Sequence, residues 1–209
     1  MNKTNIDWPG LDYTWNPITG CSRGCSYCYA RRIHDRFNKT IPFTSITYHA
    51  DRLLEPDKLK KPARIFVGSM SDIEYWSKIS FDIIIDICQG CPQHTFMFLS
   101  KNPLSYLGFK WPKNCMQGLT VTKADTFEER VYVEIMRDFP RPFLSIEPIL
   151  GVVNFSTVHI ERFEQVIVGA QTGPKKIIPK PEWIQSVQNF VPAEKIYWKS
   201  SIKKYLGVK

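Results

Sequence analysis

Short apolar segments alternate with segments of helical periodicity along most of this chain, and this alternation restricts the possible folds more than any other feature of the sequence. Strands are expected at residues 13–16, 64–68, 95–99, 117–122, 143–147, 165–168 and 195–198, with a small extra strand within 44–48. Strands that alternate with helices at this spacing form a parallel sheet with right-handed crossovers. The pattern therefore predicts an α/β fold.

Helices are expected in the gaps between these strands. One follows Cys28, where the apolar residues Ala30, Ile33 and Phe37 recur at helical spacing. A second covers residues 81–88, with Ser80 as a candidate cap. A third begins at a capping box made by Thr126 and Glu129, and a fourth has Pro181 in its first turn.

Polar residues cluster just after the predicted strands, where parallel α/β folds bind their ligands. They are the cysteine loop, Ser69–Asp72, Ser100–Asn102, Thr122, Glu147 and Gln171. About six strand–helix units are too few for a complete eight-stranded barrel. The sequence therefore predicts an open, partial (β/α)6 barrel.

Length and composition fit a single domain over residues 1–209. No apolar run reaches the roughly 18–20 residues that a membrane span needs, and the start lacks the apolar core of a signal peptide. We therefore expect a cytoplasmic protein with no membrane partner. In that compartment the six cysteines are read as metal ligands or buried thiols before disulfides.

Basic residues exceed acidic ones by 28 to 20, a formal net charge of +8. The excess is concentrated in a basic C-terminal segment, residues 175–209, with lysines at 175, 176, 180, 195, 199, 203, 204 and 209. This segment is either a solvated surface or an anion-binding face, which makes nucleic acid a candidate partner.

Three cysteines are concentrated in a short loop, residues 14–30. Cys21, Cys25 and Cys28 have the spacing C-x3-C-x2-C. A four-iron cubane usually takes four thiolates, so three would leave one iron open for a substrate or cofactor. Two alternatives remain: a Cys3His zinc site completed by His34, and ordinary buried thiols.

This spacing, with aromatic Tyr27 before the third cysteine, resembles the signature of radical S-adenosylmethionine (radical SAM) enzymes. Further phrases resemble a phage-associated radical SAM family of unassigned function, over about residues 7–199. They are Trp15–Cys21, Ser69–Asp72, Cys91–Phe96, Ser145–Gly151 and Val166–Pro174. The resemblance implies the same partial TIM-type barrel, a [4Fe–4S] cluster, S-adenosylmethionine as cofactor, and an electron donor such as flavodoxin or ferredoxin.

Site roles follow from the resemblance. Cys21, Cys25 and Cys28 would bind the cluster, and Tyr27 would lie near the adenine. The methionine amino group is expected at the loop of residues 68–72, where relatives carry a Gly-Gly-Glu-like element. The remaining cofactor-binding candidates are Gly68, Ser69, Ser71, Asp72, Ser100, Lys101, Thr120, Thr122, Glu147 and Gly169. Glu147 has an equal alternative, a structural ion pair with a nearby lysine, and Gln171 stands where relatives are expected to carry a glutamate.

Cys88, Cys91 and Cys115 form a second candidate trio, either an auxiliary cluster or buried thiols. At the level of the whole protein, three classes compete. The first is a radical SAM enzyme that makes a 5′-deoxyadenosyl radical for an unknown substrate. The others are a zinc-bound nucleic-acid-binding module and an iron–sulfur electron carrier.

Overall fold

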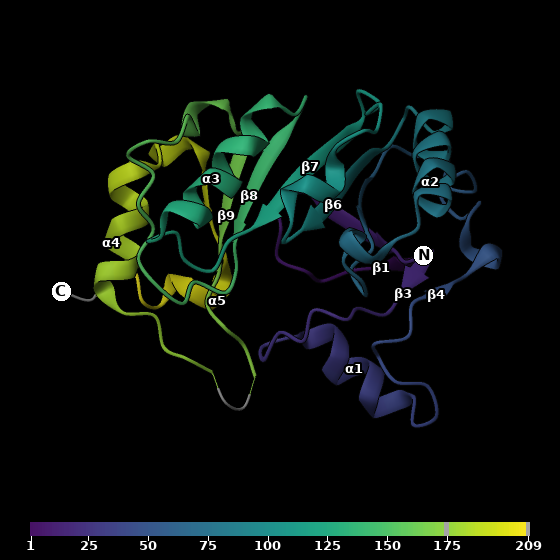
Figure 1. The fold of residues 1–209 in the computed structure, drawn as a ribbon, viewed down its shortest axis with the longest axis horizontal. Coiled ribbons are helices and arrows are strands. Elements are labelled where there is room, and N and C mark those ends of the chain that lie inside the picture. The colour runs from purple at the N-terminus through teal and green to yellow at the C-terminus, as the bar shows by residue number, and fades with distance from the viewer. Residues whose placement is uncertain (174–175, 208–209) are drawn as a thin grey trace. The chain divides into compact units, whose positions relative to one another are not determined.

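The computed structural model describes residues 1–173 and 176–207. Contacts group these residues into two units (Figure 1). Unit 1 comprises residues 1–6, 10–100 and 105–116, and unit 2 comprises residues 7–9, 101–104 and 117–209. A single domain over residues 1–209 therefore stays a prediction.

The main sheet of unit 1 is mostly parallel. Its strands follow the order β1 (Asn2–Lys3), β2 (Leu11–Trp15), β5 (Arg64–Val67) and β6 (Thr95–Ser100). Strand β1 is antiparallel to β2, whereas β2, β5 and β6 run parallel. A separate antiparallel pair joins β3 (Ile18–Thr19) to β4 (Thr47–Tyr48). Residues Ile65–Val67 of β5 form a continuous apolar run because this strand is buried on both faces.

Two α-helices belong to unit 1: α1 (Tyr29–Phe37) and α2 (Lys78–Gly90). The apolar face predicted for α2 is buried, at Phe81, Ile84, Ile85 and Cys88. Its cap differs from the prediction, because Ser77 rather than Ser80 accepts the first free backbone N–H. The Ser77 hydroxyl accepts from Ser80 N at 3.1 Å, so the helix begins three residues earlier than expected.

Helix α1 occurs where it was predicted, but its apolar residues are not all inside. Ala30 is buried, whereas Ile33 is 46% exposed and Phe37 is 79% exposed. Helical spacing identifies an apolar face and says nothing about whether a neighbouring element covers that face. The spacing of Ala30, Ile33 and Phe37 predicted the helix correctly, but it does not mark a buried face at Ile33 and Phe37.

Unit 2 is built on four parallel strands. They are β7 (Cys115–Thr120, of which residues 117–120 belong here), β8 (Pro142–Ile146), β9 (Gln165–Val168) and β10 (Ile196–Trp198), paired in that order. Its α-helices are α3 (Phe127–Ile135), α4 (Pro181–Phe190) and α5 (Ser200–Lys203). The capping box of α3 is confirmed, because the Thr126 side chain accepts from the Glu129 backbone N–H and the Glu129 side chain accepts from the Thr126 backbone N–H. Helix α4 begins at Pro181, as predicted.

Short 3-10 helices complete the chain. They are η1 (Ala50–Arg52), η2 (Ile73–Tyr75), η3 (Pro103–Tyr106), η4 (Met136–Asp138), η5 (Ile160–Arg162) and η6 (Ala193–Lys195). Across residues 1–173 and 176–207, no helix is long and apolar enough to cross a membrane. Strands alternating with helices, mostly parallel, confirm the predicted α/β class.

Candidate functional site

The cysteine loop leaves β3 and leads into α1, and its first residues are fixed by backbone hydrogen bonds. Gly20 N donates to Met70 O at 3.0 Å, and Cys21 N donates to Phe43 O at 2.8 Å. Gly20 has φ +97°, and a Cβ there would lie 2.1 Å from Ser45 O. Both the backbone angle and the space therefore require glycine at the point where the loop begins.

The three thiols of the loop are close enough to affect one another. Burial raises the pKa of the Cys21 thiol, and the negative charges of Asp72, Cys28 and Cys25 raise it further. Cys28 caps α1, because its Sγ accepts a hydrogen bond from Arg31 N at 3.3 Å. A helix N-terminus stabilises a thiolate, which is the form that binds metals.

The fit to a metal group depends on how the ligands must be arranged. Among the residues that the structure describes, no group of three or more His, Cys, Asp or Glu side chains could hold one metal ion. A zinc site needs such convergence on a single ion, and His34 instead packs against Phe43 with ring centroids 5.3 Å apart. In a cubane each thiolate binds a different iron, so three thiols spread along one loop suit a four-iron cluster better than zinc.

Two tyrosines of the cysteine loop make contacts within unit 1. Burial raises the pKa of Tyr27, and the neighbouring Cys25 raises it further, so the phenol lies against this thiol. The Tyr29 hydroxyl donates to Ser69 O at 2.7 Å. The end of the cysteine loop is thereby attached to the loop of residues 68–72, where the amino group of the cofactor was expected.

The hydroxyls of that second loop already have partners within unit 1. Ser69 Oγ donates to Asn16 Oδ1 at 3.1 Å, and Ser71 Oγ accepts from Trp76 Nε1 at 3.0 Å. Gly68 has φ +74°, and a Cβ there would lie 2.7 Å from the Trp76 ring. Gly68, Ser69 and Ser71 thus shape the loop, and a ligand role for them stays a prediction.

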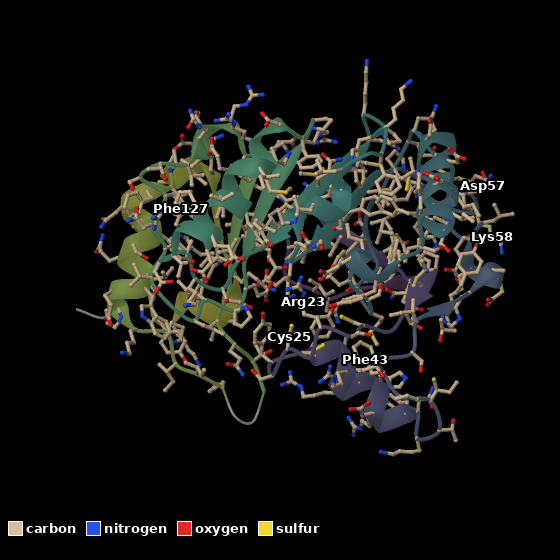
Figure 2. All side chains as sticks on the ribbon, in the orientation of Figure 1. Arg23, Cys25, Phe43, Asp57, Lys58 and Phe127 are labelled. Carbon is tan, nitrogen blue, oxygen red and sulfur yellow. The ribbon has the colours of Figure 1, made fainter. Side chains whose placement is uncertain are left out.

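Asp72 is buried and linked to the cysteine loop by Arg23, a residue that the sequence reasoning missed. Ser100 Oγ donates to Asp72 Oδ1 at 2.6 Å. Arg23 Nη2 donates to Glu74 Oε2 at 2.5 Å, and Arg23 Nε lies 4.0 Å from Asp72 Oδ2. Figure 2 shows Arg23 near Cys25 in this part of unit 1. The only available signal was a basic residue between two of the cysteines.

Unit 2 contains Glu147 and Gly169, which lie together at the carboxyl ends of β8 and β9. Glu147 Oε1 accepts a hydrogen bond from Lys199 Nζ, and Trp8 Nε1 donates to Glu147 Oε2 at 3.4 Å. A Cβ at Gly169 would lie 3.0 Å from Lys199 Cδ and 3.1 Å from Glu147 Cδ. The structural ion pair weighed for Glu147 is therefore present, and Gly169 leaves room for it.

The other candidates of unit 2 have different surroundings. The Thr120 hydroxyl is buried and has no hydrogen-bond partner in the described part of the chain, so it is available to a ligand. The Thr122 carbonyl accepts from Leu150 N at 2.8 Å. Lys101 is half-buried. Ligand roles for these three residues stay predictions.

The basic C-terminal segment is only partly available for anions. Lys175 and Lys209 lie outside the described residues. Lys195 Nζ donates to the carbonyls of Glu161 and Phe163 at 2.8 and 2.7 Å, and Lys199 is buried in its pair with Glu147. Lys195 and Lys199 are therefore engaged within unit 2.

The second cysteine trio is buried in unit 1. Burial raises the pKa of the Cys88 and Cys91 thiols. The Asn114 amide donates to Cys88 O at 2.9 Å and to Cys91 O at 3.0 Å, which fixes the backbone of this segment. An auxiliary cluster at this trio stays a prediction.

Residues 3–201 match the model of the family described as "Protein of unknown function (DUF5131)". The chain belongs to this family. The expected phage association of the family stays a prediction. No curated protein matches the sequence.

Solved structures of spore photoproduct lyase, a radical SAM enzyme, share the fold. A cysteine-to-serine mutant has a TM-score of 0.59 and 13% identity, with 95% of this chain and 79% of that chain covered. The enzyme complexed with dinucleoside spore photoproduct has a TM-score of 0.57 and 12% identity, with 91% of this chain and 76% of that chain covered. A double mutant with bound AdoMet and the same dinucleoside has a TM-score of 0.57 and 13% identity, with 87% of this chain and 62% of that chain covered.

This similarity bears on the DUF5131 chain through its fold alone, given the low identity. It confirms the predicted open, partial (β/α)6 barrel with parallel strands.

Proposed function

We propose that the protein is a radical SAM enzyme in which Cys21, Cys25 and Cys28 hold a [4Fe–4S] cluster and the fourth iron binds S-adenosylmethionine. One observation carries the proposal. Three free thiols lie on a single loop of a fold shared with spore photoproduct lyase.

When bound, such a cluster donates one electron to S-adenosylmethionine, which splits into methionine and a 5′-deoxyadenosyl radical. The chain's own residues prepare the site for this group. The N-terminus of α1 stabilises the Cys28 thiolate, because the Arg31 N–H donates a hydrogen bond to the sulfur. The guanidinium of Arg23 offsets negative charge where Asp72 and the three thiolates gather.

Asp72 is the carboxylate in unit 1 that we assign to the methionine amino group. It is buried, and a buried carboxylate favours a cation next to it. Arg23 Nε, 4.0 Å from Asp72 Oδ2, supplies part of that positive charge. An incoming ammonium would therefore compete with, or displace, the Arg23 guanidinium. Asp72→Ala should weaken cofactor binding, and an unchanged dissociation constant would move the role to Ser69, Ser71 or a backbone carbonyl.

Iron and sulfide analysis tests the cluster. After anaerobic reconstitution, replacing Cys21, Cys25 and Cys28 together by alanine should reduce iron and sulfide from about four of each per chain to near zero. Cys91→Ala is the control, because it removes a buried thiol outside the loop. A triple variant that keeps the iron and sulfide of the wild type would disprove the ligand assignment. Stoichiometric zinc in place of iron would instead favour the nucleic-acid-binding module.

Nucleic acid is our candidate substrate class. The net charge of +8 supports it, as does the dinucleoside bound in three of the similar structures. Binding should weaken steeply with salt, because counterions are released from the phosphates. Charge reversal at Lys203 and Lys204, which are exposed, should weaken it further. Lys199 is unsuitable for this test, because its charge is paired with Glu147. Binding that is indifferent to salt and to both reversals would exclude this substrate.

A further inference from the structure

Helix α1 presents a row of large apolar side chains to solvent. Tyr29, Ile33 and Phe37 are four residues apart, so they lie on one face of the helix. Their exposed fractions are 42%, 46% and 79%, and Ile41, just beyond the helix, is 47% exposed. We call these four residues the α1 stripe.

Tyr29 is joined to unit 1 through its hydroxyl, but the helix packs on unit 1 through a different side from the α1 stripe. Ala30 is the buried residue of α1, and His34 packs against Phe43 on the same side. The carboxyl-terminal end is closed by Asn38 N donating to His34 O at 2.7 Å. An amphipathic helix normally buries its apolar face. Because α1 packs through another side, its apolar face stays exposed and is a candidate interaction surface.

Positive charge borders the stripe. Arg32 and Arg36 are exposed and each precedes a stripe residue by one position, which places them about 100° around the helix along one side. Lys39 follows, also exposed, and Asp35 is the only acidic residue of α1. An apolar centre with a basic border complements a protein surface that is apolar at its centre and acidic at its rim.

The position of the stripe indicates what such a partner would do. Tyr29 follows Cys28 directly, and Cys28 is a cluster ligand in the function proposed above, on which this inference rests. That function requires one electron per turnover from outside the chain, and electron transfer slows steeply with distance. We propose that the α1 stripe is the docking surface for a small acidic electron-transfer protein that reduces the cluster.

The electron balance of this step is simple. If the donor carries a flavin, its anionic hydroquinone loses one electron and no proton, and the oxidised cluster gains that electron. No bond forms or breaks between the two proteins. A contact of this kind is short-lived and small, typically below about 1,200 Å² of total buried area, which the side of one helix can provide.

A protein partner suits the stripe better than a nucleic acid does. Single strands bind through aromatic side chains on which successive bases stack. Ile33 and Ile41 have no ring to stack on, and the Tyr29 hydroxyl is held by Ser69. Aliphatic side chains beside arginines are instead usual at the centre and edge of protein interfaces.

The test compares two reductants on the reconstituted protein. Cluster reduction is followed by stopped-flow absorbance with dithionite and, separately, with reduced flavodoxin, at two salt concentrations. Phe37→Ser is paired with Phe127→Ser, because Phe127 is also a helix-end phenylalanine and is 76% exposed (Figure 2). The double reversal Arg32→Glu/Arg36→Glu tests the charged border. Flavodoxin binding to the cluster-free protein, measured by flavin fluorescence, adds a readout that needs no iron.

The expected result is specific to the protein donor. Phe37→Ser and the double reversal should each slow reduction by flavodoxin about tenfold and weaken its binding to the cluster-free protein, and high salt should do the same. Reduction by dithionite should stay unchanged in every variant, and Phe127→Ser should match the wild type.

Other outcomes would overturn the inference. Equal flavodoxin rates and affinities in Phe37→Ser and Phe127→Ser would exclude the α1 stripe as the docking surface. So would variants that lose only oligonucleotide binding, or only self-association, without a change in flavodoxin-driven reduction. Failure of dithionite itself to reduce the wild type would overturn the proposed function, and the docking role with it.

Discussion

At the scale of single residues, two glycines of the cysteine loop are required for different reasons, one for lack of space as well as backbone angle and the other for backbone angle alone. Gly20 and Gly24 both have positive φ, +97° and +78°. A Cβ at Gly20 would collide with the Ser45 carbonyl, whereas a Cβ at Gly24 would have nothing within 4 Å. The first position must therefore be glycine for two reasons and the second for one.

We predict that Gly20→Ala lowers the free energy of unfolding of the cluster-free protein by about 3 kcal/mol or more, because backbone must shift to relieve the collision. Gly24→Ala should cost about 1–2 kcal/mol, the strain of a left-handed residue alone. Urea unfolding followed by circular dichroism measures both values. Equal losses in the two variants would contradict the clash with Ser45.

Residue-scale contacts are also where the sequence was least informative. The cysteine spacing is local, so it could be read directly. The pairing of Arg23 with Glu74 joins residues 51 positions apart, and that of Lys199 with Glu147 joins residues 52 apart. Such contacts depend on how strands bring distant segments together, which periodicity along the chain does not encode.

At the scale of elements, helix starts depend on which side chain accepts the first free backbone N–H. The sequence suggested Ser80 for α2, and the structure uses Ser77. Ser77 is exposed and Ser80 is half-buried. Their hydroxyls are 2.8 Å apart, and the two serines differ in which of them accepts the backbone N–H.

We predict that Ser77→Ala lowers the free energy of unfolding by about 1 kcal/mol, the usual value of a serine cap. Ser80→Ala should cost less, because Ser80 contributes its backbone N–H, which alanine keeps. Thermal or urea unfolding of the two variants is sufficient. A larger loss for Ser80→Ala would mean that α2 begins where the sequence suggested.

Elements were predicted well where burial makes an apolar run continuous, as in β5 and β9, whose bounds match within one residue. Parallel strands covered on both faces have this signature. The two-residue strands β1 and β3 were missed, because two residues carry no periodicity. The direction in which α1 turns its apolar face could not be predicted, since that depends on neighbours.

At the scale of the whole molecule, the amino-terminal segment is joined to the carboxyl-terminal one within unit 2. Asp7 Oδ1 accepts from the Tyr197 hydroxyl at 2.6 Å, and Asp7 Oδ2 accepts from Ser200 N at 2.5 Å. Partial burial would raise the pKa of Asp7, but the bonds from Tyr197 and Ser200 lower it overall. Asp7 is 190 positions from Tyr197 and 193 from Ser200, so these bonds join segments from near the two ends of the sequence.

This lowered pKa gives the stability of the protein a defined pH dependence. A carboxylate with a depressed folded-state pKa stabilises the fold above its unfolded value of about 3.9, and the effect is lost as pH falls through the folded value. We predict that Asp7→Asn lowers stability at pH 7 by about 1–2 kcal/mol. The difference from the wild type should shrink below about pH 4. A difference that is constant from pH 7 to pH 3 would show that the charge of Asp7 does not matter.

Reductive cleavage of S-adenosylmethionine is the reaction proposed for the cluster site, and it can be measured without knowing the substrate. Anaerobically reconstituted protein is incubated with dithionite and S-adenosylmethionine without any substrate, and 5′-deoxyadenosine and methionine are quantified by chromatography. We predict slow formation of both in equal amounts, abolished when Cys21, Cys25 and Cys28 are replaced by alanine. A fully loaded, reducible cluster that forms neither product would contradict the account and leave an electron carrier in its place.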